Sequence, residues 1–176
     1  MRLFLAINLP EELKKKLFEL GRPLASMGDV KPVEEENIHL TLKFLGEAEP
    51  GDVMPLLEKI KFVAFEVSLK GLGAFPNPNR ARVVWVGCEK GAQEIAALHK
   101  VIEAALSRFE KDRDFHPHAT LARVRFLGDK GVMADFLNKN KILEFGSFKA
   151  ASFDLMKSEL ERSGPKYGVV KSFSLV

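Results

Sequence analysis

Two short segments of this sequence place a histidine and a threonine at the same spacing. The first reads His39-Leu-Thr-Leu, and the second, about half the chain later, reads His118-Ala-Thr-Leu. Thr41 and Thr120 are the only threonines, and each follows one of the four histidines by two positions. Chance is a poor explanation for this arrangement, which favours a shared chemical role for the two segments.

The alternation of side chains along a β-strand predicts which residues of each segment share a face. Residues i and i+2 of a strand point to the same side, so each segment would set an imidazole and a hydroxyl on one face. The residues between them, Leu40 and Ala119, would then face a core. One such pair on a half-exposed strand needs no functional explanation, but two matching pairs can line one cleft.

Two histidines that face each other across a cleft can cleave a phosphodiester without a metal. One neutral imidazole takes a proton from the attacking water and the other, protonated, gives one to the leaving alkoxide, each role contributing about 10² to 10⁴ in rate. Histidine suits both roles because its unperturbed pKa of about 6.5 allows either form near neutrality. The hydroxyls of Thr41 and Thr120 would donate to the non-bridging phosphate oxygens. The spacing does not say which histidine is the acid.

Basic side chains downstream of each histidine are candidates for holding the phosphate. Lys43 would share a face with His39 and Thr41 if that strand stays regular. Arg123 lies five residues after His118, which strict alternation places on the opposite face. Its contact with the phosphate therefore requires a β-bulge or the end of the strand.

The rest of the chain predicts an α+β fold with a mostly antiparallel sheet. Strands are predicted at residues 2–8, 38–45, 66–72, 82–87, 118–126, 143–157 and 167–176. Amphipathic helices are predicted after Pro10 and at 50–60, 93–109 and 131–138. Because both histidine strands lead into Phe-Leu-Gly and an acidic residue, two related lobes are expected.

Composition limits the class of protein. A hydrophobic content of 46% allows one compact unit or two small lobes, and a net charge of +3 permits an anionic partner without requiring one. The single cysteine, Cys88, excludes an internal disulfide and favours a reducing, cytoplasmic compartment. No apolar run approaches the roughly 20 residues of a spanning helix, and no signal peptide is recognisable. Membrane insertion and secretion are not expected.

The paired motifs resemble those of the two-histidine phosphoesterase superfamily. The N-terminal Arg-Leu-Phe-Leu-Ala-Ile, the Gly-Ala-Phe-Pro loop before the segment 82–87, and the Gly-Pro-Lys-Tyr that ends at Tyr167 extend the resemblance over the whole chain. Within the superfamily, the sequence is most similar to the RNA 2′,3′-cyclic phosphodiesterases, also called 2′-5′ RNA ligases (LigT-like). Residues 1–176 are thus expected to form one bilobal domain with pseudo-two-fold symmetry. Each lobe would carry an antiparallel sheet and helices, and a cleft would lie between the lobes.

The resemblance also implies an activity. It implies hydrolysis of a terminal RNA 2′,3′-cyclic phosphate to a 2′-phosphomonoester, with a weak, reversible ability to join 2′-5′ linkages. His39 would be the proton donor to the leaving 3′ oxygen and His118 the proton acceptor from water, while Thr41, Thr120 and Arg123 would hold the phosphate. No metal or cofactor is implied. A monomer is the default expectation, and tRNA halves are the natural RNA that the family suggests.

Other aromatic and histidine residues have both functional and structural interpretations. Phe75 and Tyr167 are candidate stacking surfaces for the terminal base, since aromatic faces accept bases with little sequence preference. Phe75 is otherwise a core residue, and Tyr167 a buried hydrogen-bonding phenol. His116 is expected on a turn or rim because no acidic residue completes a known metal-ligand set with His118. His99 is expected at a solvated boundary.

Two rival functions stay open. An esterase for a small cyclic nucleotide, such as ADP-ribose 1″,2″-cyclic phosphate, would be distinguished by its turnover on mononucleotides compared with oligonucleotides. A non-catalytic RNA-binding module would depend on basic contacts that weaken with salt, and Arg80 and Arg82 either track such an RNA or lie on a solvated surface. The matched histidine and threonine pairs argue against a pure binder, which needs no acid and base.

Overall fold

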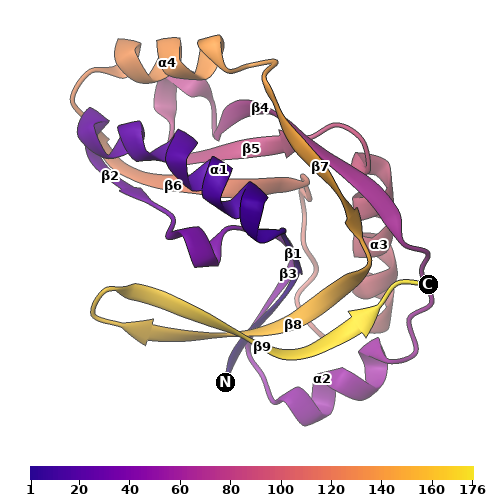
Figure 1. The fold of residues 1–176 in the computed structure, drawn as a ribbon. Coiled ribbons are helices and arrows are strands. Elements are labelled where there is room, and N and C mark those ends of the chain that lie inside the picture. The colour runs from indigo at the N-terminus through magenta and orange to yellow at the C-terminus, as the bar shows by residue number, and fades with distance from the viewer.

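The computed structural model describes all 176 residues as an α+β fold with one curled, nine-stranded antiparallel sheet (Figure 1). The strands are β1 (Arg2–Asn8), β2 (Gly28–Pro32), β3 (His39–Glu47), β4 (Phe65–Phe75), β5 (Val83–Cys88), β6 (His118–Leu127), β7 (Glu144–Ala150), β8 (Ser152–Glu161) and β9 (Gly164–Ser174). The helices are α1 (Glu11–Gly21), α2 (Pro50–Leu57), α3 (Ala92–Ala105) and α4 (Lys130–Lys139), with short 3-10 turns η1 (Arg22–Met27), η2 (Glu35–Asn37) and η3 (Pro78–Arg80).

The order of the strands is symmetric about the junction between β3 and β6. It runs β7-β4-β5-β6-β3-β1-β8-β9, with β2 paired to β6 outside this path. Strand β4 of the first half of the chain pairs with β7 of the second half, and β8 of the second half pairs with β1 of the first. Each lobe thus contains strands from both halves of the chain. The predicted bilobal fold is confirmed, with the two lobes' sheets joined into one.

The helices are exchanged between the lobes in the same way. Helix α1 follows β1 but contacts β6 and β7, and it lies with α4 over the β5–β6 half of the sheet (Figure 1). Helix α3 follows β5 but contacts β3, and it buries Ile95, Leu98 and Ile102 as its spacing predicts. A core of 37 buried apolar residues runs through both lobes. None of the helices is both long and apolar enough to cross a lipid bilayer.

A few boundaries differ from those predicted. The predicted strand at 143–157 is two strands, β7 and β8, that break at Ala151, and helix α3 ends at Ala105 rather than at Phe109. Strand β2 was not predicted because Gly-Asp-Val-Lys-Pro lacks a clear alternation of apolar and polar residues. Its partner β6 stabilises it, and that pairing is a long-range contact.

Candidate active site

Strands β3 and β6 meet at one Cα pair, Leu40 with Ala119. Because the pairing is antiparallel, this register sets His39 opposite Thr120 and Thr41 opposite His118. Leu40 and Ala119 are buried, so the four polar side chains point to the other, open face of the sheet. The junction therefore brings together residues that lie half a chain apart in the sequence.

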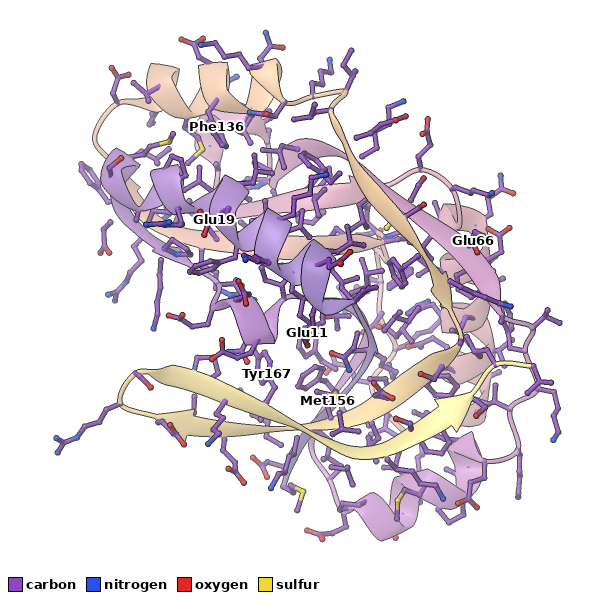
Figure 2. The ribbon with its side chains drawn as sticks, in the orientation of Figure 1. Glu11, Glu19, Glu66, Phe136, Met156 and Tyr167 are labelled. Atoms are coloured by element: carbon purple, nitrogen blue, oxygen red, sulfur yellow. The ribbon has the colours of Figure 1, made fainter.

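These four side chains line a cavity of about 320 Å³, within the range of about 300–1,000 Å³ common for small-molecule sites. Arg123, Phe75 and Tyr167 line it as well. Figure 2 shows Tyr167 on the inner side of the β8–β9 hairpin. The other lining residues are Lys31, Pro32, Val33, Glu34, Asn37, Phe44, Val83, Ser163, Gly164 and Pro165. The cavity is mixed in character, with two cations and one carboxylate among its lining groups.

A β-bulge in β6 sets the position of Arg123. The register against β5 slips by one residue between Thr120 and Ala122, so that Leu121 is the extra residue. Leu121 and Ala122 are both buried, and the alternation resumes one step later. Arg123 consequently lines the cavity. The bulge that a phosphate contact by Arg123 requires is present.

The expected position of Lys43 beside the motif residues of β3 is wrong. The register of β3 against β1 slips by one residue between Thr41 and Lys43, which turns Lys43 to the buried face and Phe44 to the cavity. Lys43 is 1% exposed, its ammonium group forms an ion pair with Glu103, and it lies 3.8 Å from Asp112. A long cation that meets two carboxylates in the interior is a structural group, and Lys43 does not reach the cavity.

The expectation of a solvated boundary position for His99 is also wrong. His99 is buried, stacks on Phe115 with ring centroids 3.9 Å apart, and places Nε2 3.0 Å from a carboxylate oxygen of Asp112. His99, Glu103 and Asp112 have the spacing of a metal-ligand group. The ammonium group of Lys43 pairs with Glu103 and lies 3.8 Å from Asp112, so the protein itself offsets part of their negative charge.

A backbone carbonyl two residues earlier holds each motif histidine. Nδ1 of His39 donates to the carbonyl of Asn37 over 2.7 Å, and Nδ1 of His118 to that of His116 over 2.5 Å. Since a carbonyl only accepts, both Nδ1 atoms carry a hydrogen, and in the neutral rings Nε2 holds the lone pair. Nε2 of His39 lies 2.8 Å from the hydroxyl oxygen of Thr41, whereas Nε2 of His118 has no protein partner. Both rings are thus set to exchange a proton at Nε2.

Burial lowers the pKa of both histidines. The pKa of His39 falls to about 4, first because desolvation penalises the charged ring and then because of positive charges such as Lys14 and Arg123. Desolvation also lowers the pKa of His118, with smaller contributions from His116 and Arg123. Both rings are therefore neutral near pH 7. A bound phosphate anion would offset the positive charges and raise both pKa values.

Each motif histidine has one of the two candidate stacking residues against it. The ring centroid of Tyr167 lies 5.4 Å from that of His39, and the ring centroid of Phe75 lies 5.0 Å from that of His118. Both contacts are edge-on, with interplanar angles of 82° and 90°. Tyr167 is half-buried and packs against Phe4 and Met156 beside the cavity. Both rings border the cavity at the level of the histidines.

Two polar residues that fasten the rim of the cavity were not identified from the sequence. Nδ2 of Asn37 donates to the carbonyl of Pro165 over 2.8 Å, and Nζ of Lys31 donates to the carbonyl of Ser163 over 3.2 Å. Both bonds hold the tip of the β8–β9 hairpin against β2 and η2. The partners are 128 and 132 positions apart, so no local pattern could have identified them.

Two His-x-Thr strands that converge on one cavity, in two lobes related by pseudo-two-fold symmetry, define a two-histidine phosphoesterase. Known proteins agree with this class. The family described as "LigT like Phosphoesterase" matches the chain twice, at residues 7–85 and 86–167. The chain therefore belongs to the LigT-like phosphoesterase family, and its two halves are the family's repeated unit.

Individual relatives match over nearly the full length. An RNA 2′,3′-cyclic phosphodiesterase of Methanocaldococcus jannaschii is 37% identical over 176 residues, covering 98% of this chain and 100% of the relative. An RNA 2′,3′-cyclic phosphodiesterase of Aeropyrum pernix is 40% identical, covering 86% and 90%. Among solved structures, TT0787 of Thermus thermophilus superposes with a TM-score of 0.81 at 31% identity, covering 99% and 98%. E. coli LigT complexed with 3′-AMP gives 0.79 at 28% identity, covering 99% and 97%.

Proposed function

We propose that this protein hydrolyses the 2′,3′-cyclic phosphate at the end of an RNA to a 2′-phosphomonoester, with weak, reversible joining of 2′-5′ linkages. The observation that carries the proposal is the meeting of β3 and β6, which turns two histidines with the same Nδ1 anchoring toward one cavity. The relatives named RNA 2′,3′-cyclic phosphodiesterase support the substrate class.

The two histidines would share the proton transfers. His118, whose Nε2 is free, would take a proton from water as the water oxygen bonds to phosphorus. The bond between phosphorus and the 3′ oxygen would break, and His39 would give its Nε2 proton to that oxygen. His39 must first be protonated, and the substrate's negative charge favours this by raising its low pKa. Proton exchange with solvent then restores both rings.

The remaining groups would hold the substrate. The hydroxyls of Thr41 and Thr120 would donate to the non-bridging phosphate oxygens, which requires Thr41 to exchange its bond with His39 for one with the phosphate. Arg123 would balance the charge that builds on those oxygens. Tyr167 and Phe75 would stack against the base of the terminal nucleotide.

The setting of the reaction is part of the same proposal. Burial raises the pKa of Cys88, the only cysteine, to about 12, so its thiol is unreactive and has no partner for a disulfide. This fits a reducing, cytoplasmic compartment. We propose a monomer that acts there, without a metal, on RNA ends such as those of tRNA halves.

The test is incubation of an oligoribonucleotide that ends in a 2′,3′-cyclic phosphate with the wild type, His39→Ala and His118→Ala, all in EDTA. We expect the wild type to give the 2′-phosphate, identified by its mobility against 2′- and 3′-phosphate standards. Each variant should lose about 10² to 10⁴ in rate. A reaction that stops in EDTA and recovers with a divalent ion would refute the metal-free mechanism.

The same assay addresses the rival small-nucleotide function, because a cavity of about 320 Å³ also has room for a small cyclic phosphate. ADP-ribose 1″,2″-cyclic phosphate is added as a second substrate. Turnover of this compound with no turnover of the RNA would replace the proposed substrate. Binding of RNA with no turnover of either compound would favour the non-catalytic alternative.

A further inference from the structure

A second hollow of about 630 Å³ lies at the end of β6, against η3 and the start of α4. Its cationic lining residues are Arg80, Arg82, Arg125 and Lys130, and no acidic residue lines it. None of these four side chains forms an ion pair. Cations gathered without neutralising partners create a positive potential that attracts a polyanion.

This hollow begins where the active-site cavity ends. On β5, Val83 lines the cavity and the preceding Arg82 lines the hollow. On β6, Arg123 lines the cavity, and Val124 and Arg125 line the hollow. Val124 is buried between the exposed residues Arg123 and Arg125, so these two arginines point to the same open face of β6, one toward each space. A chain molecule that ends at Arg123 can continue into the hollow.

Two residues of the hollow have no evident role in stability. Lys130 is the first residue of α4, where the helix macrodipole disfavours a positive charge. Phe126 lines the hollow with a side chain that is 67% exposed. Free cations beside an exposed aromatic ring are the parts of a site for single-stranded nucleic acid, because cations follow the backbone and rings stack on bases.

The β8–β9 hairpin, on the opposite side of the cavity, also carries basic residues. Nζ of Lys157 lies 3.0 Å from Glu159, and Nζ of Lys166 lies 3.9 Å from Glu161. Arg162 at the hairpin tip forms no ion pair, so the hairpin has this one free cation, compared with the four in the hollow. Paired charges give a weaker field than free ones. The charge distribution therefore favours the hollow as the path for an anionic chain.

We propose that this hollow, called here the basic groove (Arg80, Arg82, Arg125, Phe126 and Lys130), binds the single-stranded RNA immediately 5′ of the terminal nucleotide. The orientation of the RNA rests on the proposed function, which puts the cyclic 3′ end in the cavity. The basic groove makes the protein prefer oligonucleotides over mononucleotides, with little dependence on base sequence.

The activity test uses the double variant Arg80→Glu/Lys130→Glu and the control Lys59→Glu/Lys61→Glu. The control lysines are exposed and follow α2, at the end of the molecule away from α4 (Figure 1), and both variants change the net charge equally. Substrates are uridine 2′,3′-cyclic phosphate and octauridylate with the same end. We expect the wild type and the control to cleave the octamer with a kcat/KM about tenfold or more above that of the mononucleotide.

Arg80→Glu/Lys130→Glu, called here the groove variant, should have the wild-type kcat/KM on the mononucleotide. Its kcat/KM on the octamer should fall to about the same value. A groove variant whose kcat/KM rises from the mononucleotide to the octamer as much as that of the wild type would overturn the proposal. The proposal would also be overturned if the wild type hydrolysed both substrates with the same kcat/KM.

A binding measurement separates this proposal from the proposed function. The probe is 5′-fluorescein octauridylate ending in a 2′-phosphate, followed by anisotropy as salt is raised. The groove variant should bind at least about tenfold more weakly and lower the slope of log K against log salt by about 1.4. Phe126→Ala should weaken binding about fivefold or more without changing that slope.

If the wild type hydrolyses neither substrate but the variants bind as expected, the proposed function fails and the basic groove stands. If the groove and control variants bind the probe equally, the basic groove is wrong whatever the activity. Phosphatidylserine vesicles are tested in parallel. A groove variant that loses vesicle binding but keeps RNA binding would assign the surface to a lipid instead.

Discussion

Leu40 and Ala119 form the one Cα pair through which β3 and β6 meet, and Leu40 is 1% exposed and Ala119 0%. This apolar contact lies at the centre of the strand order, with matching strands on either side. Because the pair is antiparallel, each histidine faces the threonine of the other strand. A buried pair with no chemistry of its own thus fixes the relative position of the four groups proposed to carry the reaction.

Removing either threonine hydroxyl tests its proposed contact with the phosphate. Thr41→Val and Thr120→Val keep the size and branching of the side chain but lose the donor, and each should lower kcat on the cyclic phosphate by about 10²-fold. Thr→Ser at either position restores a hydroxyl and should retain most of the activity. Steady-state rates decide this, and kcat close to that of the wild type in both valine variants would contradict the assignment.

The ion pair of Lys43 predicts a loss of stability rather than of activity. Lys43→Met leaves Glu103 and Asp112 without their buried cation, which should lower the free energy of unfolding by about 3–5 kcal/mol. The folded fraction should keep the wild-type kcat, since Lys43 does not line the cavity. Urea denaturation and active-site-normalised kinetics measure the two quantities separately.

Arg123→Met makes the same type of substitution as Lys43→Met, but at a cation that lines the cavity. Arg123 is exposed and unpaired, so its loss should change stability by no more than about 0.5 kcal/mol. It should lower kcat/KM by about 10- to 100-fold, because a hydrogen bond to a charged group is lost. If instead Lys43→Met lowered kcat and Arg123→Met did not, the placement of these two cations would be reversed.

His39 should make the protein less stable in acid. Its pKa is about 4 in the folded protein and near 6.5 in the unfolded chain, so the unfolded state binds more protons between these values. His39 therefore contributes its full stability above pH 6.5 and loses it as the pH falls toward 4, by roughly 3 kcal/mol. His39→Gln should lack this pH-dependent loss of stability. Denaturant unfolding of the wild type and of His39→Gln, each at about pH 7 and about pH 4, measures the difference. Equal losses in both proteins would rule it out.

Gly73 should be required for the wall behind His118. A Cβ at this position would lie 2.3 Å from the Trp85 ring, which packs against Phe75 and His118 with centroids 5.1 Å and 6.2 Å away. Gly73→Ala should therefore cost about 1–3 kcal/mol, lower kcat and shift the emission of Trp85, the only tryptophan.

Gly51→Ala is the control for that substitution. Gly51 lies in α2 with open space where its Cβ would be, so alanine should be neutral or stabilise the protein by up to about 1 kcal/mol. If the two alanine variants had the same stability, emission and kcat, the close packing of Trp85 on Gly73 would not matter for the site.

The sequence by itself determined the four motif residues and the repeat that carries them. A strand's period of two gives each His-x-Thr pair one face without reference to any other part of the chain. The same rule showed that Arg123 could reach the phosphate only through a bulge or at the strand's end, and a bulge is there. Local spacing was sufficient wherever the information lay within a few residues.

The tertiary structure decided everything that depends on distant partners. The bulge in β3 turns Lys43 inward to Glu103, 60 positions away, although regular alternation had placed Lys43 with His39. The pairing of β4 with β7 and of β8 with β1, and the lowered pKa of His39, likewise arise from the packing of segments remote in sequence. Register slips and desolvation are set by what packs against a strand, and a single strand's sequence does not contain that information.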